Sequence, residues 1–295
     1  MPSRRQIREA TIQYLYCSDL EGGSHPAGMR EPFWEFITET DRRNLQMAIF
    51  KAVQHLAHGR GERLSEFVER TTPALAHISA FPPGENLGSL LNRLLGLESA
   101  WSIAISKLSR IPKDGDDSDT AASLEEGLAG LFKIDRELTF FRDQFLKEVA
   151  DHPSIIGPLE AVCASVRRLQ RISERLRMVE NPENFPDQTD LAKLRRSRTE
   201  IAKFRDDTDA LVDAILASKV QIDAKIGSIL ENYVPERIDP VDRAILRLGA
   251  YELLYTQTPH GVVINESIEL AKRFSTTDAS RFVNGLLDKN AKSRD

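Results

Sequence analysis

Arginines near the N-terminus are the residues whose type and spacing best fit a binding chemistry. Arg4, Arg5 and Arg8 fall within the first two turns of a predicted helix, so their guanidinium groups can lie near one another. A guanidinium group keeps its charge and binds phosphate oxygens through paired N–H donors, so several of them could contact successive phosphates. A basic N-terminus that only keeps the protein in solution is the alternative, and the residues alone favour neither.

A second stretch, residues 272–282, combines basic side chains such as Lys272 with an aromatic residue between two predicted helices. One helix is predicted to end near Phe274, and the next to begin after Thr277 or Asp278, either of which can cap it. Exposed amides at that helix start could bind a phosphate or a base edge. This stretch is therefore a second candidate for nucleic-acid contact.

Patterns that indicate catalysis or metal binding are weak in this sequence. It contains no Gly-rich phosphate loop, nucleophile elbow or zinc signature. His55 and His58 share a predicted helix face but lack a third ligand nearby, and residues 114–119 lack the ligand pattern of an EF-hand loop. We therefore expect a protein that is not an enzyme and has no metal and no cofactor.

The composition predicts the class of protein in which these residues must be positioned. The sequence has 295 residues, a net charge of −5, 41% hydrophobic residues and 29% charged residues, as is typical of a soluble, helical protein. The negative charge argues against nucleic-acid binding over the whole surface, so phosphate contacts must come from local basic clusters. The sequence has only two cysteines, no signal peptide and no apolar run long enough to span a membrane. We therefore expect a cytoplasmic protein.

Apolar residues recur at helical spacing along most of the chain, and no alternation is long enough to predict a sheet. The loops between the helices are short, which favours antiparallel neighbours. A glycine pair at 59 and 61 could break the third helix, and the acidic residues 206–209 could cap a break in the seventh. The predicted helices cover about residues 3–19, 33–38, 41–68, 87–111, 124–149, 155–179, 191–230 and 240–255.

The helix predicted after Arg237 is expected to be the centre of the core. Asp239 is a candidate N-cap with Pro240 at the first helical position, and Asp242 could reach back to complete a capping box. The residues that follow are apolar on nearly every face, which is typical of a helix covered by other helices. Arg247 and Glu252 would each need a charged partner if they were buried.

Several motifs in and after this helix resemble the NusB transcription antitermination proteins. They are PVDRAILRLGAYELLY, VVINESIELAKRF and SRFVNGLLDK, within a run from about Ala214 to Lys292, and the N-terminal SRRQIREATIQYLYCSDL resembles the family's first helix. Family members are compact single domains of roughly half this length. The resemblance implies an all-α, NusB-like helical bundle, formed by residues 1–40 and 208–295. An inserted antiparallel helical hairpin or bundle, residues 41–207, would split it.

The resemblance also implies a function and a set of binding residues. In the family, the N-terminal arginines bind boxA, a single-stranded segment of nascent RNA, and Arg4, Arg5 and Arg8 match those positions. The small-ribosomal-subunit protein NusE joins the complex, and other antitermination factors and RNA polymerase are indirect partners. His260 and Gly261 stand where family members often carry a basic residue, so one contact is missing there. The remaining candidates are Lys272, Asp278, Arg281 and Phe282 for RNA, and Tyr233 and Asp242 for the protein partner.

The predicted insertion leaves a second function open. Its basic residues between 167 and 198 could extend an RNA track, or they could pair with acids on neighbouring turns, namely Glu160, Glu174, Glu180 and Glu200. We expect the paired arrangement, because charged helix faces are ordinary. The alternative to an RNA-binding factor is a helical protein-interaction scaffold whose insertion carries the function.

Overall fold

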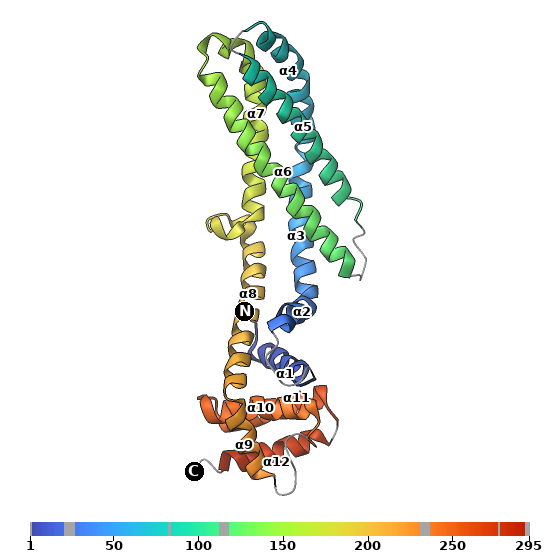
Figure 1. Cartoon of the computed structure of the whole chain (residues 1–295), viewed down its shortest axis with the longest axis vertical. Helices are drawn as coiled ribbons and strands as arrows, with labels where there is room; N and C mark the ends of the chain where they lie inside the picture. Colours follow the sequence, from blue (N-terminus) through green and yellow to red (C-terminus); the bar gives the residue numbers. More distant parts are fainter. Residues whose placement is uncertain are drawn as a thin grey trace. The chain divides into compact units, whose positions relative to one another are not determined.

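The computed structural model describes residues 2–20, 27–81, 84–111, 118–230, 237–276 and 278–292. The described residues form α-helices and two short 3-10 helices and contain no β-strand, which confirms the all-α prediction (Figure 1). Contacts divide the chain into two compact units, Met1–Thr38 with Thr199–Asp295 (unit 1) and Glu39–Arg198 (unit 2). Assigning a family-like domain to residues 1–40 and 208–295 stays a prediction.

Each unit has its own set of helices. Unit 1 contains α1 (Arg4–Leu20), α2 (Ala27–Ile37), α9 (Lys219–Ile229), α10 (Pro240–Tyr255), α11 (His260–Phe274) and α12 (Ala279–Lys292). Unit 2 contains α3 (Glu39–His58), α4 (Gly61–Ser79), α5 (Glu85–Leu108), α6 (Ser118–Ala150) and α7 (Pro153–Glu180), with the 3-10 helices η2 (Pro182–Asn184) and η3 (Thr189–Leu191). Helix α8 (Ala192–Ala217) begins in unit 2 and ends in unit 1.

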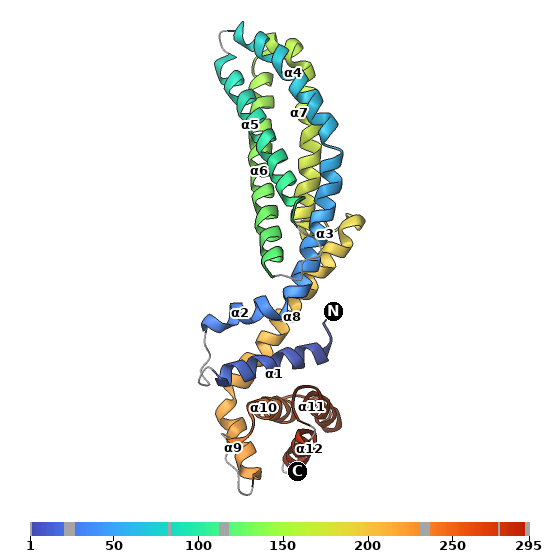
Figure 2. The same cartoon turned by 90° about the vertical axis from the view of Figure 1, so that its right-hand side faces the viewer.

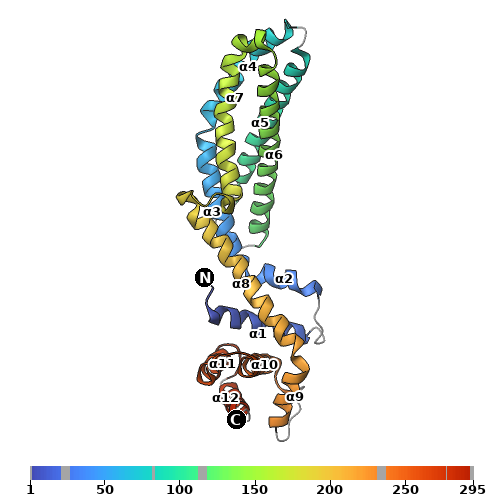
Figure 3. The same ribbon diagram turned by 90° about the vertical axis from the view of Figure 1, so that its left-hand side faces the viewer.

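Helix α10 is the central element of unit 1, as predicted. It contacts α1, α9, α11 and α12, and Figures 2 and 3 both show α1 lying across it. The helix begins as expected, because the Asp239 carboxylate accepts a hydrogen bond from the Val241 N–H at 2.9 Å. Its apolar residues form the core of unit 1 with residues of α1, α8, α9, α11 and α12.

Arg247 and Glu252, the two charges on α10 that were expected to need partners, both have them. Arg247 donates to Asp19 on α1 at 2.7 Å and to both carboxylate oxygens of Asp223 on α9 at 2.7 and 2.8 Å. Burial opposes ionisation of Asp19, but the hydrogen bonds from Arg247 and Arg243 bring its pKa below the ordinary value. Because these partners come from α1 and α9, the network fixes both helices against α10.

Three details of unit 1 differ from the prediction. Tyr255 shares an apolar stripe of α10 with Val241, Ile245 and Leu248, but it is 51% exposed because the helix ends there. Among the described residues, Asp242 makes no capping-box bond to Asp239; its side chain is buried, and its Oδ1 has no hydrogen-bond partner. The glycine in SRFVNGLLDK, Gly285, could allow close helix packing, yet a Cβ there would meet open space. The close approach is at Gly249, where a Cβ would lie 2.7 Å from the Leu287 side chain.

A small aromatic cluster joins α1, α2 and α8. Tyr14, Phe33 and Trp34 pack edge to face, with centroids 5.0 and 5.3 Å apart, and Trp34 Nε1 donates to Asp209 at 3.0 Å. The predicted helix break at residues 206–209 is wrong, because Asp209 bonds across to α2 rather than capping its own helix. The break falls at Ser218, between α8 and α9.

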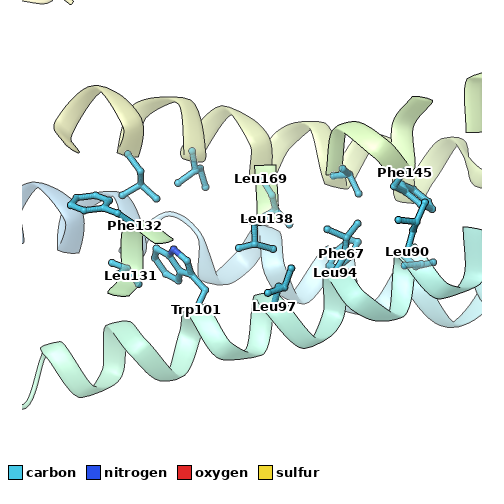
Figure 4. Packing of buried hydrophobic residues seen from close by; sticks show 14 of the residues in the cluster. Phe67, Leu90, Leu94, Leu97, Trp101, Leu131, Phe132, Leu138, Phe145 and Leu169 are labelled. Carbon is cyan, nitrogen blue, oxygen red and sulfur yellow. The ribbon is translucent and has the colours of Figure 1, made fainter. Parts of the chain in front are cut away.

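Unit 2 is a helical bundle with a continuous apolar core. Helices α4 and α7 pack together, as do α5 and α6, and α6 also packs against α7 and α3. Figure 4 shows side chains such as Leu94, Trp101, Leu138, Phe145 and Leu169 filling the space between these helices. The third predicted helix is broken after His58, near the glycine pair, to give α3 and α4.

A buried ionic network crosses the core of unit 2. The Glu98 carboxylate on α5 accepts from Arg60, which precedes α4, and from Arg142 on α6. Arg142 Nη1 donates to Ser173 Oγ on α7 at 2.7 Å, and that hydroxyl donates to Asp135 on α6 at 2.8 Å. Burial lowers the pKa of Arg60 to about 10 and raises that of Asp135. The two arginines and two acids balance in charge, as burial requires.

Several surface arginines near the end of the predicted insertion are paired, as expected. The following interactions join different elements. They are Arg168 with Glu66, Arg175 with Asp190, Arg198 with Glu183, and Arg195 with the carbonyls of Phe185, Pro186 and Gln188. A continuous RNA track through these arginines is therefore not supported.

Candidate nucleic-acid interface

The first turns of α1 meet the last turn of α11. Glu9 on α1 accepts a hydrogen bond from Arg5 Nε at 3.4 Å and another from Arg273 Nη1. Arg273 is 264 residues further along the chain, so this contact joins the two ends of the sequence in unit 1. The sequence placed Arg273 within the second candidate stretch but did not identify it as a binding residue.

Lys272 extends the same surface. Its Nζ donates to Glu269 at 2.7 Å. This hydrogen bond lowers the pKa of Glu269, and the charge of Arg5 contributes to the same shift. We define the α1–α11 basic surface as Arg5, Lys272 and Arg273. All three side chains are about half exposed, and exposed ion pairs hold their partners weakly, so these cations can exchange carboxylates for phosphates.

Arg8 does not join this surface. It is only 6% exposed, and its Nε donates to both oxygens of Glu252 on α10, at 2.9 and 3.2 Å. Its Nη1 lies 3.6 Å from Glu266 on α11. The sequence analysis grouped Arg8 with Arg4 and Arg5 as phosphate ligands. In the structure Arg4 and Arg5 are exposed, whereas Arg8 is buried and holds α1 against α10 and α11. The reason is its position on the face of α1 that packs against α10.

The start of α12 presents a separate exposed group. Asp278 and Arg281 are among the most exposed side chains of unit 1, with their charged atoms 4.0 Å apart. Phe282 is 37% exposed, whereas its neighbour Val283 is buried, so the ring lies at the surface rather than in the core. Asp278 and Arg281 form their ion pair with each other.

The two residues predicted to contact a protein partner have different outcomes. Tyr233 lies outside the described residues. Asp242 is 8% exposed, and burial raises its pKa, although the hydrogen bond from Ser275 acts in the opposite direction. Its carboxylate therefore faces the connection between α11 and α12, not open solvent.

Unit 1 contains two pockets that the sequence analysis did not predict. The first, which we call the α1–α10 pocket, has a volume of about 360 Å³ and is lined by Arg4, Ile7, Arg8, Leu211, Glu252 and residues 257–259. The second, the α1–α2 groove, has a volume of about 290 Å³ and apolar walls that include Ile12, Tyr16, Phe33, Phe36, Val241 and Phe274. Neither has a signal in the sequence, because each is lined by residues from at least three distant segments.

Neither a metal-binding cluster nor a membrane-spanning helix is present among the described residues. No group of three or more His, Cys, Asp or Glu side chains there could hold a metal ion. Most of the acidic stretch 114–119 lies outside the described part of the chain. None of the described helices is long and apolar enough to cross a membrane.

Comparison with known proteins gives one family. The model of the NusB family matches residues 166–292, a range that starts in α7 and leaves out α1. The transcription antitermination protein NusB of Macrococcus caseolyticus is 41% identical over 29% of this chain and 66% of its own length. That of Elusimicrobium minutum is 43% identical over 31% of this chain and 72% of its own length.

Part of this chain is also similar to a NusB protein of solved structure. The NusB protein of T. maritima is 38% identical, and the match covers 34% of this chain and 75% of that protein, with a TM-score of 0.30. The curated relatives are matched over about two thirds of their length, and the matches cover about 30% of this chain. The family model over residues 166–292 and the identity to relatives that are covered to two thirds or more lead to one conclusion: this chain belongs to the NusB family.

Proposed function

We propose that this protein is a transcription antitermination factor that binds boxA-like single-stranded RNA together with the small-ribosomal-subunit protein NusE. The observation that carries the proposal is the α1–α11 basic surface, which Glu9 and Glu269 assemble from the two ends of the chain. Other antitermination factors and RNA polymerase are then reached through this complex. Family membership supports the antitermination role.

The mechanism is tethering rather than a chemical reaction. Arg4, Arg5 and the two cations of α11 bind successive phosphates, while the exposed ring of Phe282 offers a face on which a base can stack. Asp278 and Arg281 at the start of α12 provide a second, separate contact with the RNA. Arg8 supports binding indirectly, because its buried pair with Glu252 fixes the helix that carries Arg4 and Arg5.

For the protein partner we propose the α1–α2 groove. Phe36 in its wall is 75% exposed, and exposed apolar surface of this kind marks protein-binding sites. Val241 also lines the groove, and the neighbouring Asp242 was one of the two residues predicted for this partner. A role for Tyr233 stays a prediction.

The RNA proposal is tested by the salt dependence of binding. Each phosphate contact on a single strand contributes roughly 0.7 to the slope of log K against log salt. Replacing Arg4 and Arg5 by glutamate should therefore weaken binding of a boxA-like RNA and flatten the slope by about 1.4. Lys51→Glu, on an exposed position of α3, is the matched control and should leave the slope unchanged. Equal slopes for all variants would reject the proposed interface.

The partner proposal has its own test. Phe36→Asp should abolish the increase in RNA affinity that NusE provides, while binding of RNA alone stays as in the wild type. Val220→Asp is the control, since Val220 is equally exposed but lies on α9, outside the groove. If NusE still enhances RNA binding by the Phe36 variant, the groove is not its site.

A protein-interaction scaffold is the second candidate function, and unit 2 is the observation that favours it. This unit has its own core and a balanced buried ionic network, and most of it lies outside the range that the family model matches. A full-length protein that ignores RNA at low salt but binds a defined protein through α3–α7 would establish this function. The salt-dependence measurement above separates the two candidates.

A further inference from the structure

We propose that the α1–α10 pocket accepts one guanine base of the bound RNA and so gives the protein a base preference. The inference rests on the proposed function, because it adds a base-reading site to the phosphate contacts of Arg4 and Arg5. It concerns unit 1 alone, since every residue that lines the pocket belongs to that unit.

The pocket has a rigid, charged floor. Arg8 and Glu252 both line it, both are more than nine-tenths buried, and they are joined by the hydrogen bonds from Arg8 Nε to the two oxygens of Glu252. Each carboxylate oxygen retains a free lone pair, and Arg8 Nη2 has no hydrogen-bond partner among the described residues. The floor of the pocket therefore presents the hydrogen-bond acceptors of Glu252 beside the hydrogen-bond donor of Arg8, all held in fixed positions.

That pattern complements the pairing edge of guanine. Guanine carries an acceptor, O6, followed by two donors, N1–H and the N2 amine, on one edge. The Glu252 carboxylate can accept from both donors while Arg8 or Arg4 donates to O6. Adenine and cytosine lack two adjacent donors, and uracil has a single N–H between two carbonyls. None of these three bases can therefore pair two adjacent donors with the Glu252 carboxylate while accepting a hydrogen bond from the Arg8 guanidinium.

The walls and size of the pocket suit a flat base. Ile7, Leu211 and Pro259 provide apolar surface, and Gln257 and Thr258 provide polar groups at the mouth. The volume of about 360 Å³ lies within the range of small-molecule pockets. A phosphate alone would be a poor occupant, because the Glu252 carboxylate would repel it. Arg4 lines the same pocket and is exposed, so a base inside can be followed by a phosphate outside.

The first measurement uses the full chain and free nucleotides. Binding of GMP, IMP, AMP and UMP is followed by calorimetry or by ligand-observed NMR. Hydrogen bonds to charged groups contribute enough that GMP should bind about tenfold more tightly than IMP, which lacks only the N2 amine. Equal affinities for the four nucleotides, or no binding of any of them, would overturn the guanine assignment.

Two variants assign the preference to the pocket. Glu252→Gln replaces one acceptor oxygen by a donor and should remove the preference for GMP over IMP. This residue also holds Arg8, so a second variant is needed that leaves the floor intact. Gln257→Trp fills the mouth from an exposed position and should abolish GMP binding, whereas Gln221→Trp, on an exposed position of α9, should not. Unchanged GMP binding by Gln257→Trp would place the nucleotide elsewhere and reject the pocket.

RNA binding by the same proteins separates this inference from the function on which it rests. If a boxA-like RNA binds with the expected salt slope but a single guanine-to-inosine change never alters affinity, the pocket is rejected and the function stands. If GMP binds in the pocket but RNA does not bind, the pocket is supported and the proposed function is rejected. If both bind and Gln257→Trp loses only the guanine preference, both are supported.

Discussion

At the scale of single residues, identical side chains on one helix have different roles. Arg5 and Arg8 both lie in the first two turns of α1, yet Arg5 is exposed beside Glu9 and Arg8 is buried against Glu252. A guanidinium group in the interior needs a carboxylate partner, and α10 provides it. The positive surface at this end of unit 1 is therefore formed by Arg4, Arg5 and the cations of α11, with Arg8 beneath it.

Substitutions of Gly249 and Gly285 provide a matched test of helix packing in unit 1. Gly249→Ala would push a methyl group to 2.7 Å from the Leu287 side chain, which must then shift within the core. Overpacking of this kind costs about 1–3 kcal/mol, which should appear in urea unfolding followed by circular dichroism. Gly285→Ala is the control and should be neutral or stabilising by about 0.5–1 kcal/mol, because its position is open and alanine favours helix. Equal effects of the two changes would contradict the described packing.

Asp242 should make stability depend on pH. Burial raises its pKa above 3.8, so the folded protein keeps a proton that the unfolded chain loses as the pH rises past that value. The contribution of Asp242 to stability therefore falls as the pH rises from 3.8 to the folded pKa and stays low above it. Asp242→Asn should raise the melting temperature at pH 7, and this gain should shrink towards pH 3. Asp278→Asn, at a fully exposed position, should show no such trend.

At the scale of elements, buried ion pairs decide which helices lie together. In unit 1, Asp19 and Asp223 bind Arg247, and Arg8 binds Glu252, so α1 and α9 are held on α10. In unit 2, Glu98 holds two arginines from different helices. Such pairs stabilise little over apolar residues of the same size, but losing one partner leaves a buried charge without compensation.

Glu98 allows a test of how much a buried ion pair contributes to the stability of unit 2. Glu98→Gln leaves the guanidinium groups of Arg60 and Arg142 buried without their shared carboxylate, and breaking a buried pair of this kind costs about 3–5 kcal/mol. Glu137→Gln breaks an exposed pair with Arg93 and should cost less than about 1 kcal/mol. Denaturant unfolding of both variants provides the measurement. A small effect of Glu98→Gln would show that the network contributes little to the stability of unit 2.

At the scale of the whole molecule, the chain forms two units whose buried clusters share no residue. One apolar cluster contains only residues of unit 2, and the other two contain only residues of unit 1. The residues proposed to bind RNA all belong to unit 1, whereas α3–α7 belong to unit 2. A change in the core of unit 2 should therefore leave RNA binding intact.

Hydrogen exchange tests this independence. In Glu98→Gln, amide protection in α5, α6 and α7 should fall, while protection of α10 and α11 and affinity for a boxA-like RNA should match the wild type. Arg8→Met is the converse change and should lower protection in α1 and α10 without affecting α6. Loss of protection throughout the chain in either variant would show that the two units unfold together.

The sequence alone determined much of the fold. Helical spacing of apolar residues predicted most of the helices, Asp239 and Pro240 predicted the start of α10, and the motifs over α10–α12 identified the family. These features depend on residues within a few turns of one another, whose preferences can be interpreted locally. Basic clusters at residues 4–8 and 272–282 were found for the same reason.

Only the tertiary structure decided what those residues contact. It separated Arg8 from Arg5, joined Glu9 to Arg273, exposed Phe282 and assigned the close helix approach to Gly249 rather than Gly285. It also formed the α1–α10 pocket and the Glu98 network, whose members lie far apart in the sequence. Burial and charge pairing depend on neighbours that are brought together by folding, and the spacing of residues along one helix does not specify them.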